Sequence, residues 1–306
     1  MKDWTREKLS GVFAPVTTAF KDDKLDLDSL RSNLRKLGET ALTGYLALGS
    51  NGEFRSLSDA EQLEVLEVFA QEKGEKVVMV GTGCESAKET IEKTEQVAAL
   101  GFEFASVLTP SYFAKQMDDQ ALLDFYTRVA DNVSIPILIY NAPRFAGGVE
   151  ISPKALSQLA AHNNIVGMKD SSLVGPNRFL AVLPNAHLNS ASAFQVLAGS
   201  ANFFYPSLHL GAVGGILSLA NYLPALCCDL YRLFLEGAYR EARDLHFRLL
   251  RLNVAVSSVY GVAGVKAAMD LLGFVGGEPR QPLRALTESQ KEDICRALIA
   301  AGIAVD

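Results

Sequence analysis

Lys169 is the residue whose type and position in this chain point most directly to chemistry. It ends the apolar run of residues 165–168 and is followed at once by Asp170 and Ser171. Burying an ammonium without a paired charge is costly, so a lysine at such a position tends to lose its proton. The resulting neutral amine is a nucleophile that forms an imine, or Schiff base, with a ketone. A strand-end lysine whose ammonium reaches solvent is the structural alternative.

Polar residues end other apolar runs in the same manner. Tyr140 ends the run that begins at residue 137, and a phenol there can pass protons to and from an imine intermediate. Residues 49–53 form a turn whose small residues let successive backbone N–H groups face a carboxylate, and Ser50 adds a hydroxyl. Tyrosine is common in strands, and glycine and asparagine are common in turns, so each feature also has a purely structural interpretation. Two further runs end in polar residues, at 109–112 and 199–200.

Short β-branched apolar runs alternate along the chain with longer segments of helical periodicity. The interval is roughly 30 residues, the size of a βα unit. Ser58 and Ser86 open two helical segments, each with a glutamate three residues later, which is the capping-box pattern. Near-continuous apolar strands belong to parallel sheets, and eight βα units close most naturally into a (β/α)8 barrel, with a doubly wound sheet as the alternative. The predicted strands are residues 12–18, 44–49, 76–81, 104–109, 136–141, 165–169, 195–199 and 212–219.

Helical periodicity continues after the last predicted strand. Residues 239–259, 264–272 and 287–301 are all helical in period, with glycine and proline breaks between them. We therefore predict an α/β fold, a (β/α)8 TIM barrel with a C-terminal helical extension. Residues 1–222 would form the strands and helices of the barrel, and residues 223–306 its last helix and the extension, in one structural unit. Active sites of such barrels form where the strands end, so we expect the polar residues above to share one mouth.

The composition favours a small-molecule ligand. The net charge is -6 and the chain has no Lys/Arg cluster, so we expect no basic surface that would bind nucleic acid or an anionic membrane. We also expect no apolar run long enough to cross a bilayer. The four cysteines lack zinc-ligand spacing, and the first residues have no signal or transit character. These features predict a reducing, cytoplasmic location.

Cofactor motifs are incomplete in this chain. Residues 81–86 begin like a dinucleotide fingerprint but lack its third glycine, and residues 211–215 lack the lysine of a phosphate-binding loop. We expect the latter glycines to permit close packing at the last strand, and Cys84 to be a buried structural thiol. We therefore predict no metal and no organic cofactor. The histidines, which have neither metal-ligand nor triad spacing, are His162, His187, His209 and His246.

Three segments together carry a family resemblance, in an order and spacing that agree along nearly the whole chain. They are GSNGE at 49–53, YNAP at 140–143 and GMKDS at 167–171. The chain thereby resembles the dihydrodipicolinate synthase/N-acetylneuraminate lyase superfamily. The resemblance implies a class I aldolase on a (β/α)8 barrel that joins pyruvate to an aldehyde or releases pyruvate. It also implies a homotetramer built as a dimer of dimers.

The resemblance implies roles for individual residues. Lys169 would form the imine with the keto acid, and Tyr140 would be the acid/base at the attacking or departing oxygen. Ser50 would relay that proton, and Tyr112 matches the family tyrosine that reaches across the dimer interface into the neighbouring relay. The backbone N–H groups of Ser50 and Asn51 would hold the keto-acid carboxylate. The residues expected along the substrate chain are Ser171 and Gly199.

The second substrate depends on departures from the family pattern. Dihydrodipicolinate synthases place an arginine five residues after the strand-end tyrosine, where this chain has Phe145. Arg144 lies one position earlier, and a one-residue shift redirects a side chain. Residues 49–54, 81–86, 166–171 and 194–200 are similar to the 4-hydroxy-2-oxoglutarate aldolase branch. We therefore favour cleavage of 4-hydroxy-2-oxoglutarate to pyruvate and glyoxylate.

Three alternatives stay open. The first is a 4-hydroxy-tetrahydrodipicolinate synthase, which condenses pyruvate with aspartate semialdehyde. The second is another pyruvate-dependent lyase of the superfamily. The third is a regulatory protein that binds a keto acid without turnover, and the complete set of Lys169, Tyr140 and Ser50 argues against it.

Overall fold

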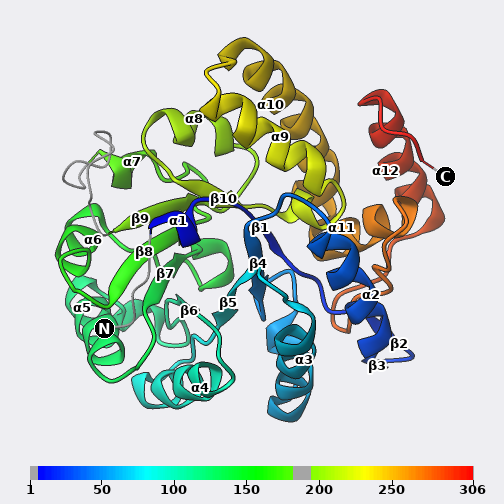
Figure 1. The fold of residues 1–306 in the computed structure, drawn as a ribbon. Coiled ribbons are helices and arrows are strands. Elements are labelled where there is room, and N and C mark those ends of the chain that lie inside the picture. The colour runs from blue at the N-terminus through cyan, green and yellow to red at the C-terminus, as the bar shows by residue number, and fades with distance from the viewer. Residues whose placement is uncertain (1–5, 182–193, 306) are drawn as a thin grey trace. The chain divides into compact units, whose positions relative to one another are not determined.

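The computed structural model describes residues 6–181 and 194–305, so His187 lies outside the described residues. Within the described part, eight parallel strands form a closed barrel in the order β1-β10-β9-β8-β7-β6-β5-β4 (Figure 1). The predicted (β/α)8 fold is confirmed, and each predicted strand is present, with bounds that differ by a few residues at most. The strands are β1 (Gly11–Pro15), β4 (Gly44–Ala47), β5 (Val77–Gly81), β6 (Phe104–Leu108), β7 (Ile137–Asn141), β8 (Ile165–Asp170), β9 (Gln195–Ala198) and β10 (Gly214–Ile216).

The chain divides into two compact units. The first unit contains the N-terminal segment up to Gly11 and Val77–Ile216, and the second contains Val12–Lys76 and Leu217–Asp306. The helices of the first unit are α1 (Arg6–Leu9), α4 (Ala87–Ala99), α5 (Asp119–Asp131), α6 (Pro153–Leu159), α7 (Asn177–Leu180) and α8 (Phe204–His209). Those of the second are α2 (Leu27–Gly38), α3 (Asp59–Glu72), α9 (Pro224–Leu235), α10 (Tyr239–Asn253), α11 (Val259–Leu271) and α12 (Glu288–Ala300).

The strands β6, β7 and β8 of the first unit are buried over their whole length. Their near-continuous apolar sequences suit a parallel sheet that is covered on both faces. The register of β7 and β8 places Tyr140 opposite Lys169. Gly167 permits the close approach of β8 to β9, because a Cβ atom there would lie 2.4 Å from the backbone oxygen of Gln195.

Side-chain caps define where several helices begin. Ser58 caps α3 in the second unit, and the reciprocal bond from its N–H to Glu61 completes the predicted capping box. Thr287 and Gln290 form the same arrangement at α12. In the first unit, Ser86 accepts a hydrogen bond from the backbone N–H of Glu89, and α4 begins there as predicted. These bonds satisfy backbone donors that a helix leaves open at its first turn.

Two features of the second unit differ from the expectations. A small antiparallel hairpin of β2 (Phe20–Lys21) and β3 (Lys24–Leu25) follows β1, and two-residue strands are too short to give a periodic pattern. The helix expected over residues 239–259 contains a π-helical turn at Val254–Ser258, after α10. The expected break before residue 264 is present, because Gly261 has a φ of 60° and a ψ of -143°, which are not helical, and it separates two helical stretches.

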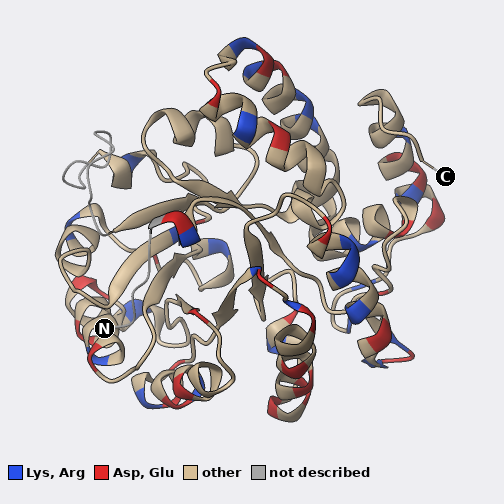
Figure 2. Ribbon diagram, in the orientation of Figure 1, with Lys and Arg blue, Asp and Glu red and all other residues tan. Residues whose placement is uncertain are grey.

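The helical stretch Tyr239–Leu271, which is interrupted by non-helical backbone at Gly261, is long and apolar enough, by length and composition, to cross a membrane. This finding corrects the expectation that no such stretch exists. More than half of its most apolar window is buried inside the protein, as in the core helix of a globular domain. Basic and acidic residues are interspersed on α10 and α12 (Figure 2).

Candidate active site

Lys169 lies near the end of β8 and is buried, with 4% of its surface exposed. Its Nζ atom is 4.3 Å from the centre of the Tyr140 ring. Burial lowers the pKa of Lys169, whereas its electrostatic interaction and hydrogen bond with Tyr140 act to raise it. The predicted pair is therefore brought together in the first unit. A buried amine with a lowered pKa beside a phenol is equipped for nucleophilic attack and proton transfer.

Asp170 anchors the strand ends next to this pair. Its Oδ1 accepts a hydrogen bond from Asn141 Nδ2 at 2.6 Å, and its Oδ2 accepts one from Ser172 Oγ at 2.7 Å. The side-chain oxygen of Asn141 in turn accepts from the N–H of Ile151 at 3.1 Å. Burial raises the pKa of Asp170, and these hydrogen bonds act to lower it. Sequence reasoning assigned no role to Asp170, although its place directly after Lys169 was a signal.

Ser171 and Gly199 meet beside this anchor. The N–H of Ser171 donates to the backbone oxygen of Asn141 at 2.8 Å, and that of Gly199 donates to the backbone oxygen of Asp170 at 2.7 Å. A Cβ atom at position 199 would lie 2.0 Å from Ser171 Oγ. Glycine is therefore required there, and the two residues predicted to lie along the substrate are in direct contact.

Tyr112 lies on a loop of the first unit and is 80% exposed. The Glu85 carboxylate accepts hydrogen bonds from the backbone N–H groups of Ser111 and Tyr112, both at 2.8 Å. The Tyr112 ring packs edge-on against Phe113, which is 63% exposed. Glu85 thus fixes the backbone from which two aromatic rings project to the surface.

Ser50 and Asn51 lie in the second unit, in the turn between β4 and the 3-10 helix Phe54–Ser56. The N–H of Gly52 donates to Gly49 O at 3.0 Å, and Thr18 Oγ1 donates to Gly52 O at 2.7 Å. Asn51 Nδ2 donates to Ser218 Oγ at 3.0 Å. Sequence reasoning did not single out Ser218. The turn is therefore fixed by side chains from both parts of this unit.

Arg144 and Phe145 lie on the 3-10 helix Pro143–Phe145, after β7. Both are exposed, and Phe145 has 61% of its surface accessible. Because the Arg144 side chain is exposed, it can adopt many rotamers, and its backbone position does not fix where its guanidinium lies.

The remaining glycine motifs have packing roles. A Cβ atom at Gly83 would lie 2.5 Å from the backbone nitrogen of Leu108, and one at Gly214 would lie 2.0 Å from Gly11 O. The predicted close packing at the last strand is thus confirmed. Cys84 is buried, as predicted, and its N–H donates to Thr90 Oγ1 at 3.1 Å. Among the described residues, no three His, Cys, Asp or Glu side chains are grouped as metal ligands would be.

The chain is similar to known proteins along most of its length. The model of the dihydrodipicolinate synthetase family matches residues 8–301. A 4-hydroxy-tetrahydrodipicolinate synthase of Methanothrix thermoacetophila is 33% identical over 284 residues, which cover 92% of this chain and 93% of the relative. An uncharacterized DapA-like lyase of Halobacterium salinarum is 34% identical over 285 residues, covering 92% and 91%. The solved 4-hydroxy-tetrahydrodipicolinate synthase of Methylacidiphilum fumariolicum has a TM-score of 0.86 at 28% identity and covers 96% of each chain.

Proposed function

The chain belongs to the dihydrodipicolinate synthetase family, and from this premise we propose that Lys169 forms the imine with pyruvate. The protein is accordingly a class I, pyruvate-dependent carbon–carbon lyase. The observation that carries the proposal is the burial of Lys169 beside Tyr140, at the ends of two neighbouring strands. Because burial lowers the pKa of Lys169, more of its amine is neutral at a given pH than for a surface lysine.

The reaction needs only groups of the protein and the substrates. The neutral amine of Lys169 adds to C2 of pyruvate, and loss of water leaves a protonated imine. A proton then leaves C3, and the electron pair of that C–H bond gives the enamine, with the imine nitrogen as the electron sink. C3 attacks an aldehyde carbon, whose oxygen takes up a proton, and water releases the amine. Cleavage follows the same steps in reverse.

The other residues receive roles from the family resemblance. Tyr140 acts as the acid/base for the aldehyde oxygen, and Ser50 relays its proton. The N–H groups of Ser50 and Asn51 bind the pyruvate carboxylate. Ser171 and Gly199 lie along the substrate chain.

Aspartate semialdehyde is the second substrate that the relatives favour. Several are named 4-hydroxy-tetrahydrodipicolinate synthase, at 31% to 34% identity. We therefore place condensation of pyruvate with this semialdehyde ahead of the cleavage that the sequence motifs favoured. Arg144, exposed on the turn after β7, would then supply the charge for the second carboxylate.

Cleavage of 4-hydroxy-2-oxoglutarate remains the second candidate, because Phe145 occupies the position of the family arginine. The two candidates differ in measurable activity. The synthase would be supported if the wild type condenses pyruvate with the semialdehyde and the Arg144→Ala variant does so more slowly. Faster release of pyruvate from 4-hydroxy-2-oxoglutarate, unaffected by Arg144→Ala, would support the aldolase. N-acetylneuraminate serves as the parallel substrate for other lyases of the superfamily.

Borohydride reduction in the presence of pyruvate tests the imine itself. We expect one reduced adduct, on Lys169, located by peptide mass spectrometry. Lys266 is an internal control, because it is fully buried but paired with Glu53. An adduct on another lysine, or none, would refute the mechanism. Imine formation without turnover of any tested substrate would indicate the regulatory keto-acid-binding protein instead.

We also propose that the chain assembles as a cytoplasmic homotetramer built from dimers. Support comes from the Tyr112 and Phe113 rings, which a single chain leaves 80% and 63% exposed. A Tyr112→Ala substitution should then lower both the assembled fraction and turnover, as measured by native mass spectrometry and kinetics. Assembly and turnover unchanged by the substitution would exclude Tyr112 from the interface.

A further inference from the structure

We propose that Glu53 is a positioning residue whose carboxylate, fixed by Lys266 and the backbone of Arg280, sets the geometry of the turn at residues 48–53. The inference rests on the proposed function, in which the N–H groups of Ser50 and Asn51 bind the pyruvate carboxylate. Lys266 and Arg280, from the C-terminal segment of the second unit, would thereby influence substrate binding.

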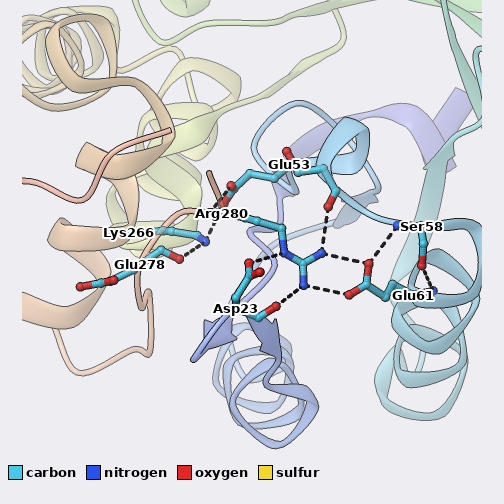
Figure 3. A network of polar contacts seen from close by, with 8 residues as sticks. Asp23, Glu53, Ser58, Glu61, Lys266, Glu278 and Arg280 are labelled. Atoms are coloured by element: carbon cyan, nitrogen blue, oxygen red, sulfur yellow. Dashed lines mark hydrogen bonds and ion pairs between the residues drawn. The ribbon is translucent and has the colours of Figure 1, made fainter. Parts of the chain in front are cut away.

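The ion pair between Glu53 and Lys266 is buried. Lys266 Nζ lies 2.6 Å from Glu53 Oε1, and the side chains of Lys266 and Glu53 are 0% and 1% exposed. Nζ also donates to the backbone oxygen of Glu278 at 3.0 Å (Figure 3). Burial lowers the pKa of Lys266, and the Glu53 carboxylate opposes that shift. A buried ion pair adds little stability over an apolar replacement, so the role of this pair is to fix the position of the Glu53 carboxylate.

Arg280 holds the second oxygen of the same carboxylate. Its backbone N–H donates to Glu53 Oε2 at 2.9 Å. Its guanidinium lies between Asp23 and Glu61 in Figure 3, and it donates to both carboxylate oxygens of Glu61, at 2.8 and 2.9 Å. These bonds lower the pKa of Glu61 to about 2. These bonds hold the backbone of Arg280 in place, and its N–H in turn holds the Glu53 carboxylate.

The turn that Glu53 ends has a strained backbone. Leu48 and Glu53 have φ angles of 50° and 52°, in the left-handed region that residues with a Cβ rarely occupy. Such conformations persist where the surroundings over-determine them, and they gather at functional sites. The N–H of Glu53 donates to the backbone oxygen of Ser50 at 3.2 Å. A shift of Glu53 therefore moves the peptide group that orients the N–H of Asn51.

The decisive experiment measures borohydride trapping at Lys169 as a function of pyruvate concentration. Glu53→Gln keeps an acceptor for the Arg280 N–H but loses the charge that holds Lys266. We expect the half-saturating pyruvate concentration to rise about 10-fold or more, since small displacements of binding groups have effects of this size. Trapping at saturating pyruvate should reach the wild-type level, because Lys169 itself is unchanged.

A double variant separates positioning from general stability. Lys266→Met leaves a carboxylate buried without its partner, so it should lower the melting temperature strongly. Adding Glu53→Gln removes that unpaired charge and should restore the melting temperature. Pyruvate binding should stay weak in the double variant. Recovery of both properties would overturn the positioning role.

Glu72→Gln is the matched control in the same unit. Glu72 pairs with Arg31 and Arg35 between α2 and α3, away from the turn. We expect its pyruvate dependence to equal that of the wild type. If wild-type protein forms no adduct, the proposed function fails. If wild type and Glu53→Gln form adducts with equal half-saturation, only the role of Glu53 fails.

Discussion

Lys169 and Tyr140 are direct register partners on β8 and β7, and the Lys169 Nζ lies 4.3 Å from the centre of the Tyr140 ring. The same contact places a proton donor beside the nucleophile and opposes the effect of burial on its pKa. One residue thus influences both the availability of the amine and the later proton transfer.

The pH dependence of imine formation should report these opposed effects. Because burial lowers the pKa of Lys169 from 10.5, the rate of trapping with pyruvate should rise with pH and level off below pH 10.5. Tyr140→Phe removes the group that raises this pKa, so the midpoint should move to lower pH. Trapping rates followed by intact-protein mass spectrometry over a pH series give both midpoints. An upward shift in the variant would contradict the structure.

Turnover of Tyr140→Phe should fall by about 10²-fold or more, as loss of a general acid/base does. Trapping at Lys169 should persist, because the amine remains. Tyr126→Phe is the control, since Tyr126 is also buried and its hydroxyl donates to Val107 O at 2.9 Å. That control should lose about 1 kcal/mol of stability and keep its turnover. Equal turnover in Tyr140→Phe and wild type would remove Tyr140 from the mechanism.

Gly199→Ala should destabilise the first unit and slow the enzyme. Its Cβ would lie 2.0 Å from Ser171 Oγ and 2.5 Å from Asp170 O, so the strand end must shift. We expect a loss of about 1 to 3 kcal/mol in the free energy of unfolding, measured in urea. At Gly38, the nearest atom to an added Cβ is the Tyr45 hydroxyl oxygen at 3.6 Å. Gly38→Ala, at the end of α2, should therefore not destabilise the protein and should raise its stability by about 0.4 to 1 kcal/mol.

Asp170→Asn should weaken the anchor beside Lys169. The new amide would place an NH2 group where the carboxylate accepts from Asn141 and Ser172, and a buried donor would lose its partner. The cost should be about 1 to 3 kcal/mol, with slower trapping at Lys169. Asp131→Asn alters an exposed carboxylate near His162 and should leave both measurements unchanged. If Lys169 is trapped in Asp170→Asn at the wild-type rate, Asp170 does not position the amine.

The barrel strands were predictable because apolar β-branched runs of strand length recur with the βα period. The neighbouring positions of Lys169 and Tyr140 followed from their places at strand ends. The position of Asp170 directly after Lys169 was a signal, but its hydrogen bond with Asn141 was not predictable, since it depends on a register that shifts between Ile137 and Leu138. Nor was the pairing of Glu53 with Lys266, because a local pattern does not say which distant residues share a buried space.

The second unit joins two segments that lie far apart in the chain, Val12–Lys76 and Leu217–Asp306. The hydrogen bonds from Arg280 to Glu61 connect these two segments, and the two residues are 219 positions apart in the chain. During synthesis, Val12–Lys76 must therefore wait until Leu217–Asp306 has emerged before the unit can close, and Val77–Ile216 emerges between these two segments. Non-local closure of this kind slows folding and prolongs the exposure of apolar strands. Val12–Lys76 therefore completes its packing only after Leu217–Asp306 has been made.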